Sequence, residues 1–194
     1  MAVLNSHARL WTVLLTTLLL GTAAGNDPRP PRPAFSEYQI KAVFLFNFAQ
    51  FVEWPENAFA ATNSPIVIGV LGTDPFGAAL PQAVAGESIG GRPLEVRRGR
   101  TLAELGRCHL LFICRSEQER LPRLLRELRG TGVLTVGETE AFARAGGVVS
   151  FLMEGNKVRF AVDPEAAVAE GLRVSAKLLK VARLVRNGVV QEDR

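Results

Sequence analysis

The chain has 194 residues and a formal net charge of +4, and 47% of its residues are hydrophobic and 22% charged. This length predicts one domain, and the apolar content excludes an intrinsically disordered chain. Because Arg9, Arg29 and Arg32 lie near the N-terminus, the remaining excess of positive charge gives little support for nucleic-acid binding.

Residues 1–24 have the order of a secretory signal peptide. Arg9 precedes an apolar run from Leu10 to Leu20, and small residues follow at 22–24. The run is about half of the roughly 20 residues that a membrane-spanning helix needs. We therefore expect export to the periplasm with cleavage near Ala24, and an uncleaved N-terminal anchor is the alternative.

The rest of the chain divides by composition into three parts. Residues 25–34 contain the proline-rich stretch Asn26–Pro33, which predicts an extended tether. Residues 35–187 are expected to form a single domain, which is long enough to bury a real core. Residues 188–194 are expected to be a tail.

The first half of this domain shows a helix, a strand and a second helix. Helical spacing of apolar residues predicts a helix over 36–52, with Ser36 as its N-cap and Pro55 beyond its end. The run Ile66–Leu71 is apolar and rich in β-branched residues, as in a strand buried on both faces. Asp74 and Pro75 follow, and they predict a helix over 74–85 that Asp74 caps.

The second half repeats strand and helix and then changes pattern. Strands are predicted at 94–98, 110–113 and 133–136, a helical turn near Leu102 and Leu105, and a helix over 116–129 that a capping box of Ser116 and Glu119 opens. Residues 148–153 and 157–162 alternate as in an antiparallel hairpin. Helices are predicted over 164–170 and 172–186.

These elements predict an α/β fold. Successive strand–helix steps favour a parallel sheet with right-handed crossovers, and the hairpin makes part of the sheet antiparallel. We expect a three-layer α/β/α domain with a mixed, mostly parallel sheet and a C-terminal β-hairpin plus helix.

Catalytic groups are scarce in this sequence. His109 begins a predicted buried strand, where a histidine is usually structural, and Asp74 and Asp163 each precede a proline as helix caps do. Gly86–Gly91 lacks the Lys-Ser/Thr of a phosphate-binding loop, and no Cys/His cluster has zinc spacing. We expect no catalytic residue, no metal and no cofactor.

The two cysteines are expected to stay free. Cys108 and Cys114 flank the predicted strand 110–113, and six residues of strand span roughly 20 Å. A disulfide needs its Cα atoms within about 7 Å. Buried thiols are therefore the preferred interpretation, and an intermolecular bridge is the alternative.

Two segments are candidate binding sites. Gly72, Thr73, Asp74 and Phe76 follow a predicted parallel strand at its carboxyl end, where α/β sheets often bind ligands, although a capped turn explains the same residues. Five aromatic residues lie close together, and a subset of them could form an exposed patch for a partner; they are Phe46, Phe48, Phe51, Trp54 and Phe59. The candidate partner-binding residues are Phe51, Trp54, Phe59, Leu152 and Glu154.

Four cations recur at helical spacing in the last predicted helix. They are Arg173, Lys177, Lys180 and Arg183. A solvated helix face explains them, and attraction to anionic lipid head groups is the alternative.

An ordered set of short segments resembles the YfiR-like periplasmic proteins. The resemblance begins with Tyr38-x-x-Lys41 and continues through Phe44, Asn47, Phe51 and Trp54-Pro55. The further matching segments, in chain order, are Val70–Phe76 without position 73, Gly91–Leu94, Cys108-His109, Leu134–Val136 before Phe142, Gly146-Gly147, Lys157–Phe160 and Gly171–Ala182. Each segment is weak alone, but the ordered set spans residues 36–185.

The resemblance implies a function without catalysis. Its best understood member represses an inner-membrane diguanylate cyclase by binding the periplasmic region of that enzyme, which limits cyclic di-GMP and biofilm formation. It further implies homodimers and control by redox state or by an outer-membrane lipoprotein. A small-ligand-binding sensor module that serves another receptor is the alternative, and an enzyme would require His109 or a carboxylate pair in a cleft.

The sequence departs from the cysteine pattern of these relatives. Relatives with disulfides pair a cysteine at the position of Gly69 with the equivalent of Cys108, and a second pair occupies the positions of Ala143 and Ser150. Neither bridge can form here, so the resemblance does not support redox control through intramolecular disulfides.

Overall fold

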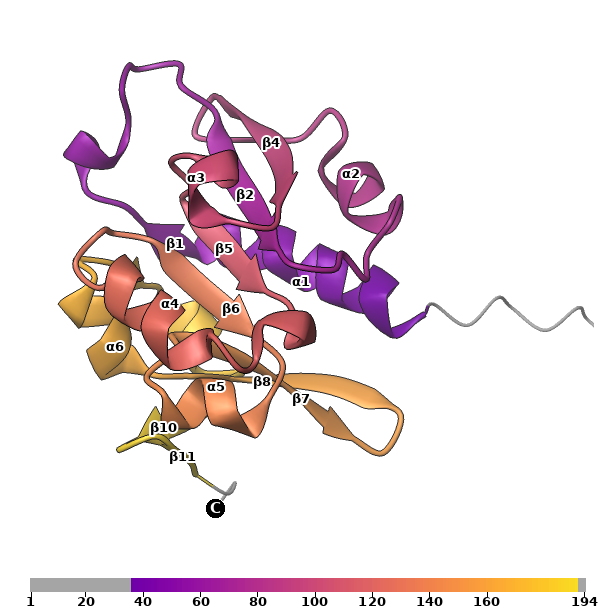
Figure 1. Cartoon of the computed structure of the whole chain (residues 1–194). Coiled ribbons are helices and arrows are strands. Elements are labelled where there is room, and N and C mark those ends of the chain that lie inside the picture. Colours follow the sequence, from indigo (N-terminus) through magenta and orange to yellow (C-terminus); the bar gives the residue numbers. More distant parts are fainter. Residues whose placement is uncertain (1–35, 192–194) are drawn as a thin grey trace, which may run out of the picture. The chain divides into compact units, whose positions relative to one another are not determined.

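The structure is a computed structural model that describes residues 36–191 (Figure 1). The predicted signal peptide and tether lie outside the described residues, as do residues 192–194. The described chain folds around a nine-stranded sheet in the order β11-β10-β8-β7-β6-β5-β2-β4-β3, and a separate two-stranded sheet joins β1 to β9.

The elements follow one another in short steps. The helices are α1 (Glu37–Phe51), α2 (Ala79–Val84), α3 (Leu102–Leu105), α4 (Leu121–Leu128), α5 (Glu140–Arg144), α6 (Pro164–Ala169) and α7 (Ala176–Leu179), with 3-10 turns at Glu56–Ala58 and Arg115–Glu117. The strands are β1 (Val52–Glu53), β2 (Ile66–Leu71), β3 (Ser88–Ile89), β4 (Arg92–Gly99), β5 (Leu110–Ile113), β6 (Leu134–Gly137), β7 (Val149–Glu154), β8 (Lys157–Val162), β9 (Arg173–Val174), β10 (Arg183–Arg186) and β11 (Val189–Val190).

The sheet is mixed and mostly parallel, as the sequence predicts. The five strands β4, β2, β5, β6 and β7 are parallel to one another, and β8 is parallel to β10. The hairpin of β7 and β8 is antiparallel and pairs Glu154 with Lys157 beside its turn. The fold-class prediction is therefore confirmed, including the C-terminal hairpin.

Helices cover both faces of the sheet and make three layers. Because side chains alternate along a strand, Leu110 and Phe112 of β5 enter one apolar cluster while Leu111 and Ile113 enter the other. Helices α1, α2, α6 and α7 contribute to the first cluster, and α3, α4 and α5 to the second. The first cluster contains an aromatic centre in which Phe48 packs against Phe151 and Phe160.

Two helix starts agree with the sequence. Ser36 accepts a hydrogen bond from the Gln39 backbone N–H, and the Gln39 side chain accepts one from the Ser36 N–H in return, which is a capping box. Asp163 caps α6 by accepting from the Ala166 N–H at 2.9 Å.

Two other predicted helix starts are wrong. The helix expected from Asp74 begins only at Ala79, because Gly77 adopts φ +53° and interrupts the helical path. Asp74 instead accepts from the Phe76 N–H and forms an ion pair with Arg98 at 2.7 Å. The helix expected from Ser116 begins at Leu121, because the Ser116 hydroxyl accepts the Thr73 N–H at 2.9 Å.

The long last helix predicted over 172–186 is also wrong. This segment contains β9, the single turn α7 and β10, and Val189–Val190 form β11 within the segment expected to be a tail. Backbone pairing with neighbouring strands replaces helical hydrogen bonds, since Val174 pairs with Val52 and Leu184 pairs with Val162. The four cations of this segment therefore do not share one helix face.

Candidate functional site

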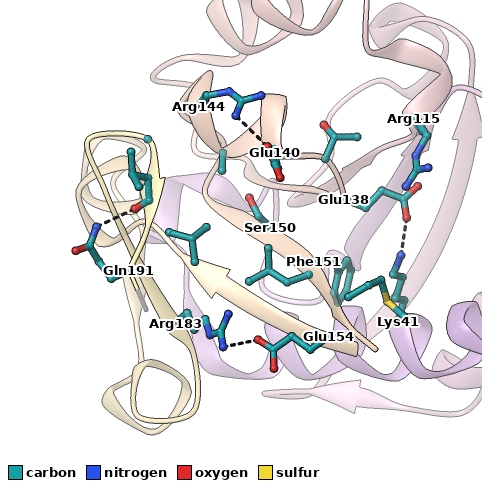
Figure 2. Close-up of a pocket in the computed structure, with 17 residues that line it drawn as sticks. Lys41, Arg115, Glu138, Glu140, Arg144, Ser150, Phe151, Glu154, Arg183 and Gln191 are labelled. Carbon is teal, nitrogen blue, oxygen red and sulfur yellow. Dashed lines mark hydrogen bonds and ion pairs between the residues drawn. The ribbon is translucent and has the colours of Figure 1, made fainter. Parts of the chain in front are cut away.

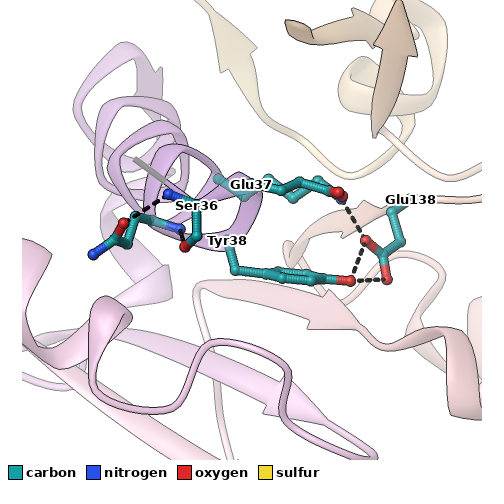
Figure 3. A network of polar contacts seen from close by, with 6 residues as sticks. Ser36, Glu37, Tyr38 and Glu138 are labelled. Carbon is teal, nitrogen blue, oxygen red and sulfur yellow. Dashed lines mark hydrogen bonds and ion pairs between the residues drawn. The ribbon is translucent and has the colours of Figure 1, made fainter. Parts of the chain in front are cut away.

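A buried charged cluster joins the start of α1 to the end of β6 (Figure 3). Lys41 is only 1% exposed, and its ammonium group donates to Glu37 and, at 2.6 Å, to Glu138. The phenol of Tyr38 donates to the same Glu138 carboxylate at 3.2 Å. Helical spacing places Glu37 and Lys41 one turn apart, and Glu138 directly follows β6.

The electrostatics of this cluster keep Tyr38 protonated. Burial raises the pKa of Tyr38 to about 12, and the negative charge of Glu138 adds to this rise. The Lys41 ammonium lies 4.8 Å from the centre of the Tyr38 ring and 5.5 Å from that of Phe151. At neutral pH the phenol is therefore a hydrogen-bond donor and not a base.

A pocket of about 550 Å³ opens beside this cluster (Figure 2). It lies at the carboxyl end of β6 and along β7, with α5 on one side and the β10–β11 hairpin on another. Its volume lies within the usual range for small-molecule sites. Charged residues that line it are Lys41, Arg115, Glu138, Glu140, Arg144, Glu154 and Arg183, and apolar ones are Ala143, Phe151, Leu152, Met153, Val189 and Val190.

Most charges of the pocket are paired with one another. Lys41 pairs with Glu138, Arg144 with Glu140 at 3.1 Å, and Arg183 with Glu154 at 2.5 Å. The guanidinium of Arg115 makes no hydrogen bond or ion pair with the residues of 36–191. The pocket therefore holds one cation whose charge the described carboxylates leave unpaired.

The Ser150 hydroxyl lines the pocket and has no hydrogen-bond partner in the part of the chain that the structure describes. Ser150 is 1% exposed, and its hydroxyl forms no hydrogen bond within the described part of the chain. A buried hydroxyl without a partner is costly, and a water or ligand that hydrogen-bonds Ser150 would remove this cost.

The structure divides the five predicted partner-binding residues between two places. Leu152 and Glu154 line the pocket, on the same face of β7 as Ser150. Phe51, Trp54 and Phe59 lie elsewhere and are half-buried against the first apolar cluster.

Trp54 and Phe59 make contacts within the domain, around His109. The Trp54 indole donates to the backbone oxygen of His109 at 3.1 Å, and the Phe59 ring stacks on the His109 ring at 4.5 Å. Arg92 also lies against this group, 3.7 Å from the centre of the Phe59 ring. These rings thus form an ordered cluster around His109.

His109 has the structural role that its position in the sequence suggests. It is buried, and its Nδ1 accepts the backbone N–H of Val67 at 3.0 Å. Burial lowers its pKa, which keeps the imidazole neutral and able to accept this bond.

The predicted ligand turn is closed by its own contacts. Gly72 adopts φ +104°, and a Cβ there would lie 2.4 Å from the Ser116 hydroxyl. The Thr73 N–H donates a hydrogen bond to that hydroxyl, and Asp74 forms an ion pair with Arg98. The Phe76 ring is buried against Phe112. The turn thus connects β2 to the segment after β5.

Both cysteines are free and buried at opposite ends of β5. Burial raises the pKa of Cys108 to about 11 and that of Cys114 to about 12. Both thiols therefore stay protonated at neutral pH, and protonated thiols are poor nucleophiles.

The sequence-based candidates do not include the Lys41–Glu138 pair or Ser150. A lysine within an apolar helical stripe, one turn after Glu37, is the available signal, but its partner lies 97 residues further on. Across residues 36–191, no helix is long and apolar enough to cross a membrane, and no three His, Cys, Asp or Glu side chains gather as metal ligands would.

Two solved structures share this fold. A conserved domain protein from Vibrio cholerae matches with a TM-score of 0.54 and 10% sequence identity, over 78% of this chain and 61% of that one. The ABC domain from Streptococcus pneumoniae, solved in complex with L-Trp, matches with a TM-score of 0.50 and 13% identity, over 77% of this chain and 60% of that one. This chain thus spans about three fifths of each, and at these identities the likeness concerns the fold alone.

A comparison of whole sequences with curated proteins gives no match. The family comparison gives a match to the YfiR/HmsC-like model over residues 38–183, from Tyr38 of the charged cluster to Arg183 of the pocket. That range contains nearly all of the described domain, and the chain therefore belongs to the YfiR/HmsC-like family.

Proposed function

We propose that this protein is a periplasmic regulator that represses an inner-membrane diguanylate cyclase by binding the periplasmic region of that enzyme. The observation that carries the proposal is the family match over residues 38–183, which supports a regulator rather than a catalyst. The proposal includes export and cleavage near Ala24, and with them a periplasmic site of action. Homodimerisation and contact with an outer-membrane lipoprotein are further expectations of the family resemblance.

The surface around β7 and β11 suits a partner better than the aromatic cluster does. Met153 is 47% exposed and Val189 is 59% exposed, and both line the rim of the pocket beside Leu152 and Glu154. An apolar patch with a charged rim is typical of a protein–protein interface. Trp54 and Phe59, by contrast, are engaged around His109.

Repression needs no chemistry from this protein. A binder that prefers the inactive state of the cyclase shifts the population of the enzyme towards that state by its difference in affinity. Loss of binding then releases the enzyme.

The test combines gene deletion with matched surface variants. Deletion is expected to raise the cellular level of cyclic di-GMP. Expression of the unaltered protein in the deletion strain should return that level to its original value. Met153→Arg should fail to restore repression, because a charge enters the apolar patch, whereas Val168→Arg should restore it. Val168 is 72% exposed on α6 and does not line the pocket.

Two results would count against the proposal. One is an unchanged cyclic di-GMP level after deletion, with no cyclase recovered alongside the protein. The other is equal repression by both variants at equal protein levels, which would remove the patch around Met153 from the interface.

A small-ligand sensor is the second candidate function, and the pocket favours it. The unpartnered Ser150 hydroxyl is the specific observation. Ligands that bind the folded state raise the melting temperature, so thermal-shift screening separates a sensor from a module that binds only proteins.

A further inference from the structure

Within residues 36–191, the pocket beside β7 combines a cation without an ion pair, Arg115, a buried hydroxyl without a partner, Ser150, and an aliphatic wall. Alternation along β7 places Ser150, Leu152 and Glu154 on one face, opposite to the face on which Phe151 enters the first apolar cluster. Figure 2 shows Ser150 between the Arg144–Glu140 pair and the Arg183–Glu154 pair, with Arg115 beside Glu138 at another side. Arg115 and Ser150, which have no partner within residues 36–191, therefore line one pocket from different sides.

Arg115 is the feature of the pocket that bears on the charge of an occupant. Four cationic side chains line the pocket, and three of them form ion pairs with its three carboxylates. Lys41 also pairs with Glu37, which lies outside the lining, so cations and carboxylates balance in number. Arg115 remains, and a guanidinium binds a carboxylate through two parallel hydrogen bonds. A carboxylate on the occupant would therefore give Arg115 the ion pair that it lacks within residues 36–191.

The Ser150 hydroxyl and the wall define the rest of the occupant. A buried hydroxyl requires a hydrogen-bonding group on the body of the ligand, separate from the carboxylate at Arg115. The wall is aliphatic at Ala143, Leu152, Val189 and Val190. These three requirements together describe an acylated amino acid with a free carboxylate, a secondary amide and an aliphatic side chain.

We propose that this pocket binds the carboxylate-terminal residue of an N-acylated aliphatic amino acid, with Arg115 holding the carboxylate and Ser150 hydrogen-bonding the amide. The same chemistry occurs in a free N-acyl amino acid and at the C-terminus of a peptide. The inference does not rest on the repression of a cyclase, and either can fail without the other.

Calorimetric titration of the full chain with three related probes tests each contact. N-acetyl-L-leucine carries all three features, N-acetyl-L-leucinamide lacks the negative charge, and 4-methylpentanoate lacks the amide. N-acetyl-L-leucine is expected to bind at least about tenfold more tightly than either analogue, as one lost charge-assisted or buried hydrogen bond implies. Acetyl-Ala-Ala-Leu distinguishes the sources, because tighter binding than N-acetyl-L-leucine indicates a peptide C-terminus and weaker binding a free acid.

Two variants separate the proposed contacts from a general loss of structure. Arg115→Gln should remove the preference for N-acetyl-L-leucine over its amide, whereas Arg126→Gln, an exposed arginine on α4 outside the pocket, should keep it. Ser150→Ala should raise the melting temperature of the unliganded protein, because it removes an unpartnered buried hydroxyl, and should abolish the preference over 4-methylpentanoate. Opposite effects on stability and on binding are not expected of a residue that only supports the fold.

The proposal is overturned by any of three results. These are no heat of binding for N-acetyl-L-leucine or the tripeptide at millimolar concentration, equal affinity for the acid and its amide, and unchanged affinity in Arg115→Gln.

Discussion

The single tyrosine of the chain reports directly on the buried cluster. Tyr38 is the only tyrosine in the sequence, so the near-ultraviolet absorbance of phenolate follows this residue alone. We expect an ionisation midpoint of about 12 rather than the ordinary value near 10. Glu138→Gln should lower the midpoint towards 10, because it removes the adjacent negative charge.

The same shift makes a prediction about alkaline stability. A pKa that is higher in the folded state than in the unfolded state gives stability that is fully present below about pH 10 and is lost as the pH rises towards 12. Tyr38→Phe should therefore lose less stability than the unaltered protein between these values, as denaturant titrations at several pH values would show. Equal losses in both proteins would contradict the role assigned to Tyr38.

Within this cluster, replacement of Lys41 should lower the free energy of unfolding the most. Its side chain is 1% exposed and that of Glu138 is 3% exposed, so Lys41→Met leaves a buried carboxylate without its cation. We expect the free energy of unfolding to fall by about 3–5 kcal/mol, measured by urea denaturation.

A double variant and a surface control sharpen this prediction. Adding Glu138→Leu to Lys41→Met should recover most of the loss, because the unpaired buried charge is gone. Arg123→Met breaks an exposed pair with Glu127 on α4 and should change stability by less than about 1 kcal/mol. Similar losses in Lys41→Met and Arg123→Met would show that the cluster is not buried in solution.

At the scale of elements, local signals predict the strands better than the helices. The runs Ile66–Leu71 and Leu110–Ile113 are apolar throughout because they are covered on both faces, and β2 and β5 occupy those residues. Helix starts are harder to predict, since Asp74 and Ser116 are good caps that tertiary contacts with Arg98 and Thr73 use instead. Propensity cannot reveal partners that are distant in sequence.

The C-terminal segment shows the same limit more strongly. Residues 172–186 have apolar residues at helical spacing, but the backbone of 183–186 completes the sheet beside β8. The pocket depends on this outcome, because β10 brings Arg183 to Glu154 and β11 adds Val189 and Val190 to the wall. A site built from strands that the local pattern does not predict cannot be predicted from that pattern either.

The contact between β2 and the start of β5 predicts a cross-link that this chain lacks. A Cβ at Gly69 would lie 3.5 Å from the Cβ of Cys108 and 2.7 Å from its sulfur. Disulfides have Cβ separations of about 3.5–4.5 Å. In Gly69→Cys, the new cysteine should therefore form a disulfide with Cys108 under oxidising conditions. Because this disulfide closes a loop of about 40 residues, it should raise the free energy of unfolding by up to about 4 kcal/mol.

Thiol titration and the effect of reductant check this cross-link. The oxidised variant should show one free thiol, that of Cys114, and its gain in stability should vanish when it is reduced. Gly69→Ala should be less stable than the unaltered protein, since its Cβ meets the Cys108 sulfur and a methyl group of Leu111 without forming a bond. Three titratable thiols in Gly69→Cys after oxidation would mean that the strands are further apart than the structure has them.

For the domain as a whole, one sheet connects two cores of unequal size. The cluster beneath α1 contains the aromatic centre around Phe48, and the cluster beneath α4 consists mainly of aliphatic residues with Phe142. Both take alternate side chains from the same central strands. Loss of either helix layer therefore uncovers one face of the strands that also hold the other cluster.

Neighbouring leucines of β5 test this coupling. Leu110 is 0% exposed in the first cluster and Leu111 is 1% exposed in the second, so Leu110→Ala and Leu111→Ala each remove the same group from a different core. We expect each to lower the free energy of unfolding by about 2–5 kcal/mol, whereas Val168→Ala, at a position 72% exposed, should change it by less than about 0.5 kcal/mol. Because the sheet is shared, near- and far-ultraviolet circular dichroism should follow one coincident transition in each variant. Two separate transitions in Leu111→Ala would show instead that the α3–α4–α5 layer unfolds independently of the aromatic core.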